Sequence, residues 1–166
     1  MFELKPISHE SVASALAKAE HYRLLAEPSE AESICRDVLA LEPSNQHALV
    51  VLALALTDLI PRDPKAFARA VEISGRLESA YERAYYSGIC WERRAKAQHH
   101  TGAHGSSHHV YEWLVKALNF FDTAEQLRPA GNDDALLRWN TCVRFLSHNR
   151  ELAPRTEDEP SAILSE

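Results

Sequence analysis

Several features that define other classes of protein are scarce or missing in this sequence. The chain of 166 residues is 45% hydrophobic but has only 5 glycines, which is the composition of a folded chain with an apolar core. Its longest apolar run, 48–56, is too short to span a bilayer and indicates a buried helix instead. The first ten residues contain acids and no apolar stretch, unlike a secretory signal. We therefore expect a soluble, cytoplasmic protein with no membrane partner.

Cysteine and positive charge are also in short supply. The three cysteines, Cys35, Cys90 and Cys142, are far apart and form no CxxC pair, so they indicate buried thiols rather than a disulfide framework. Acidic residues outnumber basic ones by 24 to 18, and the formal charge of −6 argues against non-specific binding of nucleic acid.

Catalytic motifs are missing as well. The sequence has no GxGxxG, GxxxxGK, HExxH or GxSxG pattern, each of which carries a known cofactor, metal or nucleophile chemistry. Most carboxylates fall on faces that helical periodicity assigns to solvent. We expect no enzymatic activity and no cofactor.

What the chain does contain is apolar residues at helical spacing. Prolines divide it into segments, because the residue before a proline avoids the helical conformation. Ser29 with Glu32 predicts a capping box, and Asp63-Pro64 predicts an N-cap followed by proline in the first turn. The predicted helices are 9–26, 29–42, 46–60, 63–75, 80–99, 107–127 and 132–148.

This pattern predicts an all-α fold of about seven helices with no sheet. Residues 1–8 form a lead-in, residues 9–149 form the helical domain, and 99–109 is a His-rich insertion within it. Residues 150–166 are acidic and contain proline, so we expect a flexible tail.

The segment 113–129 carries a more specific pattern. Small, aromatic, small and helix-ending residues stand at relative positions 0, 4, 7 and 12, as Ala117, Phe121, Ala124 and Pro129. A weaker copy is Ala31, Cys35, Val38 and Pro43. This pattern resembles the second helix of the tetratricopeptide (TPR) repeat. The resemblance covers roughly 12–147 and implies antiparallel helix hairpins in a right-handed superhelical array. Another α-helical bundle is the alternative.

The spacing of the repeats locates an irregularity. The first small residues of the pattern, Ala31, Ala66 and Ala117, are separated by 35 and then 51 positions. The TPR period is about 34 residues. The excess of 17 in the second interval predicts an insertion around 99–109. The last helix is expected to cap the array.

The resemblance implies that the first helix of each pair lines a concave groove for a peptide or a partner helix. The family register assigns ten residues to that groove as partner-binding candidates: Arg23, His47, Glu82, Tyr85, Tyr86, Ile89, Glu92, Arg93, Asn140 and Arg144. The alternative for the apolar ones is a place in the core. The clamp with which chaperone-adaptor members hold a C-terminal carboxylate is not expected, because its positions are Leu16, Glu20, Val51, Glu82 and Tyr86.

Two clusters of side chains, one of histidines and one of basic residues, could serve another kind of binding. Five of the nine histidines fall within 99–109, and His100, His104 and His108 would share a helix face and could bind a metal. The two glycines of that segment argue against a helix, so a polar or a pH-sensitive loop is the alternative and we expect no metal. The basic segment 91–96 (WERRAK) could contact RNA or phosphate, but ion pairing at a helix surface is the expected explanation.

These observations favour a non-enzymatic protein-interaction module, an adaptor, scaffold or assembly subunit that binds a protein or peptide partner. The alternatives are a self-assembling structural subunit, which would be a homo-oligomer, and a metal-binding protein that uses residues 99–109.

Overall fold

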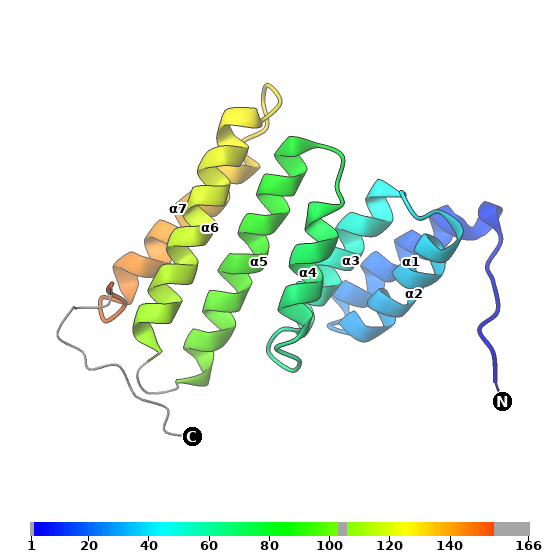
Figure 1. Ribbon diagram of the computed structural model, residues 1–166, viewed down its shortest axis with the longest axis horizontal. Coiled ribbons are helices and arrows are strands. Elements are labelled where there is room, and N and C mark those ends of the chain that lie inside the picture. Colours follow the sequence, from blue (N-terminus) through cyan, green and yellow to red (C-terminus); the bar gives the residue numbers. More distant parts are fainter. Residues whose placement is uncertain (1, 103–105, 155–166) are drawn as a thin grey trace, which may run out of the picture.

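The computed structural model describes residues 2–102 and 106–154, and every regular element within them is a helix (Figure 1). The elements are a short 3₁₀ helix η1 (His9–Ser11), followed by α1 (Val12–Leu24), α2 (Pro28–Leu41), α3 (Gln46–Leu59), α4 (Ala66–Gly75), α5 (Ala80–Thr101), α6 (Ser107–Leu127) and α7 (Asp134–His148). The predicted all-α fold is confirmed. No helix among the described residues has both the length and the apolar character needed to cross a membrane.

The helices form an elongated array with α1 and α7 at opposite ends (Figure 1). Each α-helix packs against the next one in the chain. In addition, α1 packs against α3, and α3 packs against α5. The odd-numbered helices α1, α3 and α5 therefore form a continuous layer, against which α2, α4 and α6 pack.

The predicted start of α2 is wrong in detail. The helix begins at Pro28, whose missing N–H costs nothing in a first turn, and Ser29 does not cap it. Glu32 accepts hydrogen bonds instead from Arg36, at 2.6 Å, and from Arg69 of α4, at 2.7 Å. The ion pair across two helices therefore takes the carboxylate that a capping box needs.

The start of α4 also differs from the prediction. Asp63 lies in a turn before the helix, where its Oδ1 accepts from the Lys65 N–H at 3.0 Å and its Oδ2 accepts from Arg69 at 2.7 Å. The helix itself begins at Ala66. By contrast, α3 begins with Asn45 as N-cap, whose side chain accepts from the Ala48 N–H at 2.9 Å.

Two main apolar clusters make up the core. The first is formed mainly by α1–α4, with Cys90 of α5, and includes Ala31, Cys35 and Val38. The second is formed by α5–α7 and contains Ala117 and Phe121, which are completely buried. The small–aromatic–small pattern in the sequence thus marks fully buried positions in both halves of the molecule.

Helix rather than loop occupies both ends of the predicted insertion 99–109, of which residues 103–105 lie outside the described ranges. α5 and α6 have 22 and 21 residues, whereas α3 and α4 have 14 and 10. α5 continues through His99 and His100 to Thr101. Gly102, at φ 62°, then ends the helix in the left-handed conformation typical of a helix C-terminus. The extra length in the sequence therefore extends both helices of one pair.

The predicted tail contains one residue that packs. Leu152 is buried against the cluster formed by α5–α7, so the ordered chain continues past the end of α7. Residues 155–166 lie outside the described ranges, and the prediction of flexibility for that part stays a prediction. In the lead-in, Ile7 packs against the cluster formed by α1–α4.

Candidate functional site

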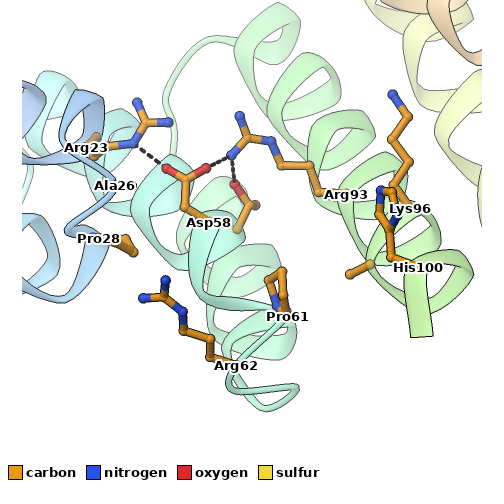
Figure 2. Close-up of a pocket in the computed structure, with 11 residues that line it drawn as sticks. Arg23, Ala26, Pro28, Asp58, Pro61, Arg62, Arg93, Lys96 and His100 are labelled. Carbon is orange, nitrogen blue, oxygen red and sulfur yellow. Dashed lines mark hydrogen bonds and ion pairs between the residues drawn. The ribbon is translucent and has the colours of Figure 1, made fainter.

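A cavity of about 500 Å³ opens where the C-terminal parts of α1, α3 and α5 meet (Figure 2). We call it the α1–α3–α5 cavity. Four permanently charged basic side chains line it, namely Arg23, Arg62, Arg93 and Lys96. Asp58 is the only acidic residue in the lining.

Asp58 joins the three helices of the cavity wall. Arg23 of α1 donates from Nε to Asp58 Oδ2 at 2.9 Å, and Arg93 of α5 donates from Nη1 to Asp58 Oδ1. The same Nη1 donates to Thr57 Oγ1 at 2.7 Å. Figure 2 shows the carboxylate between the two guanidinium groups. One negative charge therefore holds two positive charges in place, and a net positive charge remains.

A second ion cluster lies next to the cavity and involves Lys96. Its Nζ donates to Glu92 Oε1 at 2.5 Å, and Arg138 of α7 donates to Glu92 Oε2 at 3.4 Å. Glu92 is only 1% exposed. Burial lowers the pKa of the Arg138 guanidinium, but the Glu92 carboxylate and Tyr85 together outweigh burial, and the pKa is raised. Here too, one carboxylate serves two cations.

Arg62 follows α3 and is exposed. Its backbone N–H bonds to the Leu59 carbonyl at 2.9 Å, but its guanidinium makes no hydrogen bond or ion pair with any described residue. His100, also exposed, lies one turn beyond Lys96 at the rim of the cavity (Figure 2). Among the described residues, none occupies the guanidinium of Arg62, which is therefore available to a ligand.

Only two of the ten predicted partner-binding residues line this cavity, and they are Arg23 and Arg93. His47 is exposed on α3, where its Nε2 lies 2.8 Å from Glu20 Oε1. Asn140 and Arg144 are exposed on α7. The structure therefore distributes these residues over more than one surface.

The predicted partner contacts of Ile89 and Glu92 need correction, because both side chains are buried and inaccessible to a partner. They lie on the side of α5 that α6 and α7 cover. Glu82 is half-buried in the first turn of α5, and its N–H donates to the N-cap Ser79 at 3.3 Å.

Tyr85 and Tyr86 are half-buried and pack against the cluster formed by α5–α7. Their rings meet edge to face with centroids 5.2 Å apart, and the Tyr85 ring lies 6.1 Å from that of Phe121. Burial raises the pKa of the Tyr86 hydroxyl to about 12. These two rings contribute to the core, which is the alternative that the sequence left open for the apolar groove residues.

The histidines that the structure describes do not gather as one cluster. His99 packs against Phe145 of α7 with ring centroids 5.2 Å apart, while His108 and His109 contact each other at 3.9 Å. Over residues 2–102 and 106–154, no three His, Cys, Asp or Glu side chains come together as metal ligands. His104 lies outside these ranges, so the set His100, His104 and His108 is not tested.

The basic segment 91–96 uses its charges within the protein. Arg93 and Lys96 pair with acids as described above. Arg94 lies over the rings of Phe67 and Trp113, at 4.2 and 4.0 Å from their centroids. Ion pairing and cation–π contacts therefore account for this cluster.

The three cysteines are free thiols and all are buried. Burial raises the pKa of Cys35 and Cys142 to about 12 and that of Cys90 to about 11. Each thiol stays protonated at neutral pH and is therefore a poor nucleophile.

Sequence reasoning missed Asp58 and Arg62 as site residues. A signal for Asp58 was present, because it is the only Asp, Glu, Lys or Arg in α3, in which residues 48–56 are all apolar. A lone acid on such a helix needs a partner of opposite charge. Arg62 gave no comparable signal, since a basic residue beside Pro61 in a turn is common.

No family model matches the chain, and a search of curated proteins found no match. The resemblance to the TPR family therefore remains an expectation based on the residues named above.

Proposed function

We propose that this protein is a non-enzymatic interaction module with TPR-like helix pairs, an adaptor or assembly subunit of the cytoplasm. It binds a segment of a partner protein on the layer formed by α1, α3 and α5. The α1–α3–α5 cavity is the observation that supports this proposal most directly. The buried, protonated thiols fit a reducing compartment.

The shape of this surface suits a peptide or a short helix. Three helices contribute to one concave site, and the basic side chains around it can fix the register of a bound segment. Its ionic contacts hold α1, α3 and α5 together before any partner arrives. A preformed site of this kind loses little entropy on binding.

Site-specific photo-crosslinking in a lysate of the native host tests this proposal. A photoreactive amino acid replaces Arg62 in the cavity or, as a control, the exposed Ala68 of α4. We expect a discrete crosslinked protein from position 62 but not from position 68. The identified protein is then purified and titrated against the wild type and Arg62→Glu. Equal crosslinking from both positions, or none from position 62, contradicts the proposal.

Self-association is a second candidate, and α7 favours it. Leu137 and Val143 on this helix are 63% and 41% exposed, and α7 is the last helix of the described array. Sedimentation equilibrium of the wild type and of Leu137→Glu tests this. A dimer that Leu137→Glu dissociates supports self-association, and a monomer at all concentrations excludes it.

A further inference from the structure

The α1–α3–α5 cavity has more positive charge than its own acids neutralise. We propose that it binds the side-chain carboxylates of an acidic protein segment, an inference that rests on the function proposed above. The ligand is thus a stretch of the partner rich in Asp and Glu.

The first argument is the local charge. Arg23, Arg62 and Arg93 line the cavity against the one carboxylate of Asp58, both oxygens of which are already hydrogen-bonded. The fourth basic side chain in the lining, Lys96, is paired with Glu92. The chain as a whole carries a formal charge of −6, so its other surfaces repel an acidic segment on average. The cavity is therefore a positive site on a negative protein, which directs such a segment to this one place.

The second argument is the number of free donors. Arg23 uses only its Nε toward Asp58, so its two terminal nitrogens have no hydrogen bond to any described residue. The guanidinium of Arg62 is unpaired in the same sense, and Figure 2 shows it extending from the end of α3 toward Pro28. A guanidinium presents two parallel N–H groups that match the two oxygens of a carboxylate. The cavity thus holds two arginines with open donor pairs.

The third argument distinguishes a carboxylate from a phosphate. Phosphate sites typically use backbone N–H groups at the positive start of a helix. This cavity lies at the C-terminal parts of α1, α3 and α5, where the helix dipoles are negative, and α2 begins at Pro28, which has no N–H. Asp58 adds a fixed negative charge. These groups disfavour a phosphate dianion more strongly than a carboxylate.

The fourth argument is the apolar part of the lining. Ala26, Pro28, Pro61 and Ala97 lie between the basic side chains. Small flat surfaces of this kind can contact the methylene groups of Asp and Glu side chains and the backbone of an extended chain. A volume of about 500 Å³ accommodates a few residues of such a segment.

Fluorescence anisotropy with the full chain and a synthetic peptide tests the proposal. The probe is a short peptide, labelled at its N-terminus and amidated at its C-terminus, in which Asp and Glu alternate with Ala and Pro. A matched peptide replaces each acid with Asn or Gln. We expect saturable binding of the acidic peptide only, weakened about tenfold or more by Arg62→Glu. His100→Glu is a second variant at the rim that should also weaken binding.

Lys18→Glu is the matched control, because it makes the same charge change on an exposed α1 residue outside the cavity. It should leave affinity within about twofold of the wild type, since Lys18 does not line the cavity and salt screens exposed charges that do not contact the ligand. Circular dichroism melts of the three variants verify that each is folded. Equal weakening by Lys18→Glu and Arg62→Glu would mean that only net charge matters, and it would overturn the site.

Two more arms identify the source of the negative charge. A peptide with a free C-terminus and no side-chain acids should bind no better than the amide peptide. Inorganic phosphate at matched ionic strength should displace the acidic peptide no better than chloride. Stronger binding of the free C-terminus, or preferential displacement by phosphate, overturns the proposal.

Failure of this inference is distinguishable from failure of the proposed function. If position 62 crosslinks a partner but neither peptide binds, the carboxylate assignment is wrong and the interaction surface stands. If position 62 crosslinks nothing and no peptide binds, both are wrong.

Discussion

The core formed by α1–α4 and the core formed by α5–α7 differ in the size of the side chains that pack between paired helices. The first pair of helices, α1 and α2, contributes Ala19 and Cys35 to its core, two small residues that are both fully buried. The pair α5 and α6 has Gly88 and Phe121 instead, and a Cβ on Gly88 would lie only 2.5 Å from Cε1 of Phe121. The large Phe121 side chain of α6 fills the space that a side chain at position 88 of α5 would occupy. The close packing of α5 and α6 therefore depends on the absence of a Cβ at Gly88.

The two regions also treat their acids differently. Asp58, in α3, bridges two arginines with its side chain 28% exposed, whereas Glu92, in α5, bridges Lys96 and Arg138 with 1% exposed. A half-solvated ion pair contributes little to stability, but a buried charge that loses its partner is costly. The C-terminal region should therefore be the more sensitive one to small substitutions.

The largest effect is expected from adding one methyl group at the α5–α6 crossing. Gly88→Ala should destabilise the protein by about 3 kcal/mol in urea unfolding, because the Phe121 ring has to move in a packed core. Gly75→Ala, in α4, is the matched substitution, since nothing lies within 4 Å of the added Cβ. It should stabilise the protein by up to about 1 kcal/mol through helix propensity.

The double variant Gly88→Ala with Phe121→Leu isolates the clash. If steric overlap is the cause, the smaller side chain should make the double variant more stable than the sum of the single effects allows. Additive free energies of unfolding would mean that the crossing does not depend on this contact.

A smaller effect is expected from neutralising the two bridging acids. Glu92→Gln should cost about 2 kcal/mol of unfolding free energy, because it leaves two cations around a buried amide that cannot balance them. Asp58→Asn should cost less than about 1 kcal/mol, because water can solvate Arg23 and Arg93. Guanidinium chloride screens charges, so urea is the suitable denaturant. A larger loss from Asp58→Asn than from Glu92→Gln would reverse the proposed ranking of the two regions.

The smallest effect is expected at the turns. Ala26, between α1 and α2, has φ 59°, and Gly131, between α6 and α7, has φ 80°. Ala26→Gly should stabilise the protein by about 0.5 kcal/mol, because glycine adopts this backbone conformation without steric cost. Gly131→Ala should destabilise it by about 1 kcal/mol for the same reason. Thermal melts of both variants check the prediction, and shifts of the same sign would contradict it.

The prolines, the buried stripes and the small–aromatic–small pattern in the sequence were sufficient to predict seven helices and most of their ends. Helix boundaries are local properties, set by residues such as Asn45 and Gly102 that act on their own backbone. The predictions that were wrong at helix starts involved Ser29 with Glu32 and Asp63. In both places the carboxylate that was expected to cap the helix pairs with Arg69 of α4 instead.

The candidate site was only partly predictable for the same reason. The resemblance to the TPR family implied a groove position for Arg23 and for Arg93. The sequence alone determined that α1, α3 and α5 exist and which residues they carry. Only the tertiary structure decided that Ile89 and Glu92 are covered by α6 and α7 and that Asp58 joins Arg23 to Arg93. Burial and ion pairing between residues 35 positions apart depend on how helices pack, and periodicity along one helix does not contain that information.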